Sequence, residues 1–155
     1  MVSAFFEAYL SLLHELHTEI EKALAGLPAA ALDWTPGPET NSLAVLVVHL
    51  TGAERFWVGD VALGEPSHRV RAEEFKAAGL TAEALIARLQ DSEAYIRHAL
   101  PRLSLDDLEA QRIHPRDGRT YSVAWCLLHA LEHTATHMGH IELTSQLWRQ
   151  AQSGD

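Results

Sequence analysis

Residues 125–140 read WCLLHALEHTATHMGH, and the rest of the chain is interpreted from this segment. It holds four of the chain's ten histidines within about three turns of one expected helix. At a step of about 100° per residue, His129, His133, His137 and His140 fall within about 80° of one another. The other side of the helix is apolar and is formed by Ala124, Leu127, Leu128, Leu131, Ala135, Met138 and Ile141. We therefore predict an amphipathic helix that packs on one face and carries a stripe of imidazoles beside that face.

The spacing of His133 and His137 suits two ligands of one metal ion, because residues one turn apart are separated by about 6 Å along a helix. These two histidines lie closest to the apolar face, whereas His129 and His140 lean toward the polar side with Glu132. A His-x-x-x-His pair alone is a loose signal, and it lacks the adjacent glutamate of the helical zinc proteases. A metal site therefore requires a further ligand from elsewhere in the chain.

Apolar residues that recur at intervals of three and four predict long helices at about 3–25, 42–63, 81–100 and 122–150. Four such helices in a chain of 155 residues predict an all-α, four-helix bundle formed by a single domain, residues 1–155. The order and handedness of the helices stay open, because the connections are long.

The connecting segments carry weaker signals. We expect a loop over residues 29–41, where prolines and a glycine interrupt regular structure. Residues 72–78 suit a short helical piece, and residues 104–108 suit one turn of helix. An Asp-Gly pair within residues 113–121 indicates a small hairpin.

The third histidine is His49, near the middle of the expected buried face of the second long helix. Within about 80° of it lie Val45, Leu46, Ala53, Phe56 and Trp57, whereas Thr51, Glu54 and Arg55 fall outside that face. A buried imidazole needs partners for both nitrogens, or a metal on one of them. Gly52 costs this helix about 1 kcal/mol relative to alanine, which suits a close approach by another backbone or by a ligand. His14 and His17 are expected at the surface or rim, and His114, which precedes a proline in a loop, is expected to be solvated.

The composition excludes several classes of function. The formal net charge of −9 argues against binding to nucleic acid or to an anionic membrane surface. The single cysteine, Cys126, permits no intrachain disulfide and is expected to be a small buried hydrophobe. We see no signal peptide or transmembrane span, so a cytoplasmic protein is expected.

Three motifs in order resemble the DinB/YfiT-like superfamily. They are WTPGP at 34–38, SLAVLVVHLTGAERFW at 42–57 and HALEHTATHMGHIE at 129–142, and together they extend the resemblance over nearly the whole chain. The resemblance implies a four-helix bundle, commonly a homodimer, with a divalent metal, often nickel or zinc, on three histidines. By position these ligands are His49, His133 and His137, the three that the helical periodicity also selects.

The resemblance also assigns supporting roles. Relatives often carry glutamate where this chain has His133, so His129 is a reserve ligand. His140 lies near the expected site, Glu132 or His129 could orient a ligand imidazole, and Trp57 and Trp125 could wall the pocket. Characterised relatives are thiol S-transferases that use a thiol such as mycothiol, bacillithiol or glutathione, and some isomerise maleylpyruvate.

Three interpretations remain open. The first is a metal-dependent enzyme that adds a low-molecular-weight thiol to an electrophilic small molecule, since a metal favours the nucleophilic thiolate. The second is a non-enzymatic, metal-stabilised or ligand-binding dimer in a stress response. The third makes the histidines structural and involves no metal.

Overall fold

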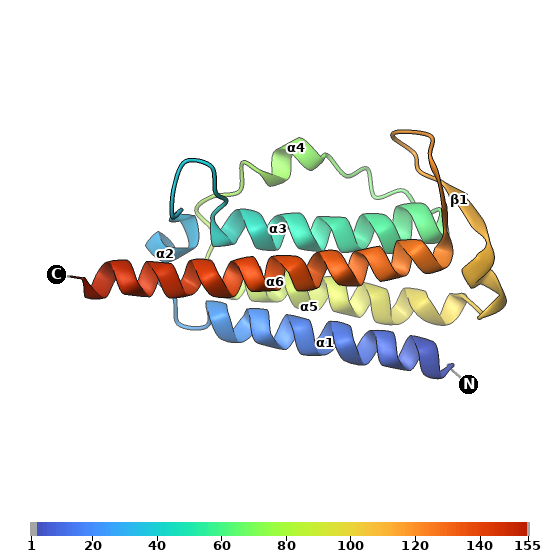
Figure 1. Ribbon diagram of the computed structural model, residues 1–155, viewed down its shortest axis with the longest axis horizontal. Helices are drawn as coiled ribbons and strands as arrows, with labels where there is room; N and C mark the ends of the chain where they lie inside the picture. The colour runs from blue at the N-terminus through green and yellow to red at the C-terminus, as the bar shows by residue number, and fades with distance from the viewer. Residues whose placement is uncertain (1–2, 155) are drawn as a thin grey trace.

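The computed structural model describes residues 3–154, which form a bundle of long helices (Figure 1). The long helices are α1 (Ala4–Leu24), α3 (Leu43–Glu54), α5 (Ala82–Ala99) and α6 (Val123–Ser153). This arrangement confirms the predicted all-α, four-helix bundle. Across residues 3–154, no helix combines the length and hydropathy that spanning a membrane requires.

The long helices contact one another in a closed ring, in the order α1, α6, α3 and α5. In Figure 1, α3 and α5 run in one direction and α1 and α6 run in the other. Because α3 and α5 are parallel, the chain must return along the whole bundle between them. This crossover, residues 64–81, contains α4 (Arg71–Glu74) and lies beside α3.

Polar residues fix where three of the helices begin. The hydroxyl oxygen of Ser42 accepts the amide of Val45 at 3.2 Å, and Thr81 accepts that of Ala84 at 3.2 Å. Ser122 likewise accepts the amide of Trp125 at 3.1 Å. These bonds satisfy amides that have no partner inside the helix. At its other end, α3 continues as a π-helix, η1 (Arg55–Leu63), which the sequence did not predict.

The shorter elements agree with the predictions in part. The prediction of a loop over residues 29–41 is wrong for its first residues, which form the short helix α2 (Ala29–Asp33). Pro28 precedes this helix, where it needs no amide donor, and three alanines follow. The predicted hairpin is confirmed by β1 (Gln111–Ile113) and β2 (Thr120–Ser122), which pair antiparallel. Two 3₁₀ turns, η2 (Leu100–Arg102) and η3 (Asp106–Glu109), precede it.

The core consists of two apolar clusters with a polar layer between them. One cluster packs Phe6, Tyr9, Leu13, Phe56, Ile96 and Leu127, with their neighbours, and the other packs Ile20, Leu24, Leu46, Leu85, Leu89 and Ile141. Each long helix contributes one residue to the polar layer: His17, Glu54, Ser92 and Thr134. The Glu54 carboxylate accepts hydrogen bonds from His17 Nε2 at 2.8 Å, from Thr134 Oγ1 at 2.7 Å and from Ser92 Oγ.

The polar layer corrects two expectations from the sequence. His17 was expected at the surface or rim and Glu54 outside the buried face, yet each is only 1% exposed. For Glu54 the projection failed because it assumes that a helix buries a single face, whereas residues 43–51 of α3 are all buried. His17, on α1, is buried beside it as its hydrogen-bond donor. Burial lowers the pKa of His17, but the hydrogen bond to Glu54 and the charges of Glu54, Glu93 and Glu21 outweigh it, so the pKa is raised.

Candidate metal centre

Three histidines from two antiparallel helices meet at one point in the bundle. His49 comes from the middle of α3, while His133 and His137 come from successive turns of α6. The ring centroid of His49 lies 5.0 Å from that of His133 and 5.1 Å from that of His137. The ring centroids of His133 and His137 are 4.4 Å apart. One potential ligand atom from each ring lies within 4.8 Å of the others. We call these residues the His triad, and they are the three ligands expected from the sequence.

The charge state of the His triad suits a metal. Burial, followed by the neighbouring histidines, lowers the pKa of His133 to about 3 and that of His137 to about 4. Both imidazoles are therefore neutral at physiological pH and keep a lone pair for coordination. In addition, His133 Nδ1 is buried and has no hydrogen-bond partner within residues 3–154. Coordination to a bound cation would give this nitrogen a partner, so the residues present fit a divalent metal.

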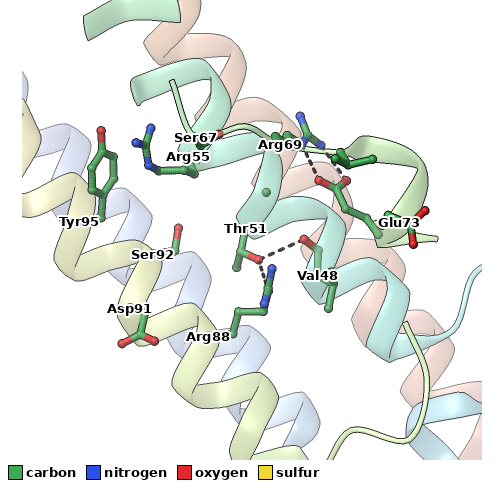
Figure 2. Close-up of a pocket in the computed structure, with 13 residues that line it drawn as sticks. Val48, Thr51, Arg55, Ser67, Arg69, Glu73, Arg88, Asp91, Ser92 and Tyr95 are labelled. Carbon is green, nitrogen blue, oxygen red and sulfur yellow. Dashed lines mark hydrogen bonds and ion pairs between the residues drawn. The ribbon is translucent and has the colours of Figure 1, made fainter. Parts of the chain in front are cut away.

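The third imidazole is held by a carboxylate. His49 Nδ1 lies 2.8 Å from Glu74 Oε2, and since an ionised carboxylate only accepts, that nitrogen carries the proton. Nε2 is then left with its lone pair free. Arg69 donates to the same carboxylate through Nη2, at 2.8 Å, and through Nε (Figure 2). Burial raises the pKa of Glu74, but the bonds from Arg69 and His49 together lower it below its usual value. This carboxylate–histidine arrangement is typical of protein metal sites.

Gly52 makes room for this carboxylate. A Cβ at this position would lie 2.3 Å from Glu74 Oε1 and 3.2 Å from Arg69 Nε. A close approach to Gly52 therefore exists, but it is made by the side chain of Glu74 and not by a backbone or a ligand. The sequence did not single out Glu74. The only signal was Gly52 itself, because residues 67–79 show no periodicity that would place Glu74 beside α3.

The other predicted residues surround the His triad without joining it. His140 Nδ1 lies 3.2 Å from His137 Nδ1, at the exposed edge. The reserve ligand His129 is outside the cluster, with its ring centroid 6.0 Å from that of His133. Glu132 lies 3.3 Å from His129 Nδ1, and within residues 3–154 no hydrogen bond joins it to the His triad. Glu74, rather than Glu132, orients a triad imidazole.

Aromatic rings continue from the His triad toward the hairpin. The ring of Trp125 stacks on His129 at 4.6 Å, and Trp57 meets His129 edge-on at 4.9 Å. The ring of His129 thus links these tryptophans to His133 of the His triad. His114, which was expected to be solvated, lies 5.2 Å from Trp57, because the hairpin folds back over η1. The ring of Phe75, a residue that was not singled out from the sequence, packs on His49 itself at 5.0 Å.

A cleft of about 310 Å³ lies beside the His triad and includes His137 in its lining. His140 and residues 39–41 of the loop before α3 supply polar lining. Leu46, Leu143 and Leu147 supply apolar lining. A small molecule with an apolar body could lie there beside His137.

Comparison with known proteins identifies the family and supports the fold. The model of a family described as mycothiol-S-transferase matches residues 8–150. Among solved structures, a conserved protein from Enterococcus faecalis superposes with a TM-score of 0.73 at 17% identity, over 91% of this chain and 95% of that one. A mutant of a mycothiol-dependent maleylpyruvate isomerase gives a TM-score of 0.64 at 19% identity, over 86% of this chain and 59% of that one. At these identities the two structures establish the fold alone. No curated protein matches the chain.

Proposed function

The chain belongs to the mycothiol S-transferase family, of the DinB/YfiT-like type, and from this premise we propose that it is a metal-dependent enzyme that joins a low-molecular-weight thiol to an electrophilic small molecule. The family supports a thiol-related enzyme, and the metal and the two substrates are our proposal. The observation that carries the proposal is the convergence of His49, His133 and His137 next to Glu74.

The proposed metal is nickel or zinc, held by His49, His133 and His137. Imidazole ligands suit both ions, and three of them leave a position open for a substrate. A bound metal would supply Lewis acidity that favours the thiolate form of the thiol.

The chain's own residues would prepare the site for this chemistry. Glu74 fixes the proton of His49 on Nδ1 and directs Nε2 away from the carboxylate. The depressed pKa values of His133 and His137 keep both imidazoles neutral. The cleft beside His137 would hold the electrophile's apolar body on Leu46, Leu143 and Leu147, which brings it close to a thiolate at the His triad.

The first experiment is elemental analysis of tag-free protein. We expect near-stoichiometric nickel or zinc in the wild type and its loss in His49→Ala and His133→Ala. His14→Ala is the control, because that side chain is 63% exposed and lies outside the His triad. The proposed ligand set is wrong if His14→Ala loses metal as completely as His49→Ala does. The proposal of a metal site is wrong if even the wild type takes up neither nickel nor zinc.

A second experiment separates an enzyme from a non-enzymatic binding module. The metal-loaded protein is incubated with mycothiol, bacillithiol or glutathione and a small electrophile, and consumption of the thiol is followed. Turnover in the wild type that is lost in His133→Ala supports the enzyme. Full metal content with no thiol consumed by any combination favours the metal-stabilised module.

A further inference from the structure

The imidazoles of His137 and His140 lie side by side on α6, at the edge of the His triad. They are three residues apart and therefore share one side of the helix. Their Nδ1 atoms are 3.2 Å apart, which is within reach of a hydrogen bond between two ring nitrogens. Among residues 3–154, no other hydrogen bond and no ion pair involves either ring. Each ring is therefore the polar partner of the other.

One proton must lie between these two Nδ1 atoms. Two protons would bring two donors together, and no proton would leave two lone pairs facing each other. Either His137 donates to His140, or His140 donates to His137. The two arrangements have the same heavy-atom positions and differ only in the ring that carries the proton.

Metal binding by His137 selects one of these arrangements. A histidine ligand is a neutral imidazole, which carries one proton and one lone pair. If His140 donates, the Nδ1 lone pair of His137 is used in that bond and its own proton lies on Nε2, so neither nitrogen is left for a metal. If His137 donates from Nδ1, its Nε2 keeps a lone pair. Only the second arrangement makes His137 a ligand.

We propose that His140 is a positioning residue of the metal centre, whose Nδ1 accepts the proton of His137 Nδ1 and leaves His137 Nε2 for the metal. The proposal rests on the metal site proposed above and assigns a role to an imidazole outside the His triad. His140 does for His137 what Glu74 does for His49, whose Nδ1 lies 2.8 Å from that carboxylate. Because its Nδ1 accepts, a neutral His140 carries its own proton on Nε2.

Two substitutions of His140 test this role through the zinc affinity, measured by competition with a chelator. His140→Leu removes the acceptor, and we expect the affinity to fall about tenfold. This is the lower end of the usual effect, because His140 is exposed and water can replace it in part. His140→Asn is the rescue, because its amide oxygen is bonded to Cγ, as Nδ1 is in histidine, and can accept the same proton. We expect its zinc affinity to lie closer to that of the wild type than to that of His140→Leu.

These variants separate a positioning residue from a fourth ligand. If His140→Asn loses as much zinc affinity as His140→Leu, the proposal is overturned, because asparagine accepts a hydrogen bond but is a poor substitute for histidine as a zinc ligand. Equal affinities of the wild type and His140→Leu overturn it as well. His98→Leu is the matched control, since His98 is an exposed histidine in the last turn of α5. If His98→Leu weakens zinc as much as His140→Leu, the loss is not specific to this contact and the proposal is wrong.

Nitrogen NMR of the zinc-loaded protein reads the two rings directly, at about pH 8, where an unperturbed imidazole is neutral. Correlations from the carbon-bound ring protons identify the state of each ring nitrogen. We expect zinc on Nε2 of His137 and the proton of His140 on its Nε2. Zinc on Nδ1 of either ring, or a proton on Nδ1 of His140, overturns the proposal. A wild type that takes up neither nickel nor zinc refutes the metal site itself, so the two failures are distinguishable.

Discussion

Replacing Gly52 by alanine tests how Glu74 supports the metal centre. The new Cβ would lie 2.3 Å from Glu74 Oε1, whereas ordinary van der Waals contact begins at 3.4 Å. The carboxylate must therefore retreat by about 1 Å. A hydrogen bond of 2.8 Å to His49 Nδ1 does not survive a lengthening of that size. The substitution thus removes the orientation of His49 without touching any proposed ligand.

The expected energies follow from two opposing effects. Alanine stabilises a helix interior by about 1 kcal/mol relative to glycine. Loss of one hydrogen bond to a charged group costs about 1.5–3 kcal/mol. The free energy of unfolding of Gly52→Ala, measured with urea in the presence of a chelator, should therefore fall by about 0.5–2 kcal/mol. Metal affinity, measured by competition with a chelator, should fall about 10- to 100-fold, as is usual when a residue that orients a ligand is lost.

Gly139→Ala is the matched control. Gly139 also lies inside a long helix, but a Cβ there meets no atom within 4 Å. This variant should gain up to about 1 kcal/mol of stability and keep the metal affinity of the wild type. If Gly52→Ala matches Gly139→Ala in both measurements, Glu74 does not support His49 and the argument is refuted.

Three further predictions concern titrating groups and the core. His17→Ala should lower the free energy of unfolding, measured by chemical denaturation, by about 3–5 kcal/mol, because it leaves the buried Glu54 carboxylate without its charged partner. His14→Ala is the control and should change this free energy by less than about 0.5 kcal/mol. Equal effects of the two substitutions would contradict a buried pair of His17 and Glu54. The folded-state pKa values of His133 and His137, about 3 and about 4, lie below their unfolded value of about 6.5, so their contribution to stability is complete above pH ~6.5 and is lost as the pH falls toward 4. The urea midpoint of metal-free protein should fall over this pH range. If the midpoint of His133→Gln falls as steeply with decreasing pH as that of the wild type, His133 is not responsible for the loss. Burial raises the pKa of Cys126 to about 11, so a thiol reagent should modify it only on unfolding, and rapid labelling of native protein would show that it is accessible.

The sequence predicted the long helices and the His triad because both depend on local periodicity. His133 and His137 share a face through their spacing alone, and the central place of His49 follows from the apolar residues around it. These predictions need no knowledge of which helices are neighbours. The structure brings the three residues together because α3 and α6 are adjacent.

The sequence could not predict contacts that depend on the crossover and on complete burial. Glu74 lies in a mixed, charged segment, and only the parallel arrangement of α3 and α5 carries that segment past His49. Glu54 was misplaced because the helices around α3 bury residues on more than one of its faces. His17, on α1, was misplaced because its partner in the core, Glu54, was not expected there. The π-helix after Glu54 changes the residue spacing that an α-helical projection assumes.

The polar layer also determines which alignment of the helices is allowed. If α1 slid by about one turn, an apolar residue such as Leu13 or Ile20 would face Glu54 in place of His17. The carboxylate would then be buried without its charged partner, at a cost of several kcal/mol that two apolar clusters alone would not impose. Apolar side chains of similar size tolerate such sliding, whereas a single buried carboxylate with three donors from three helices does not. We therefore expect the polar layer to fix the alignment of the helices, and with it the position of His49 on α3 relative to the histidines of α6.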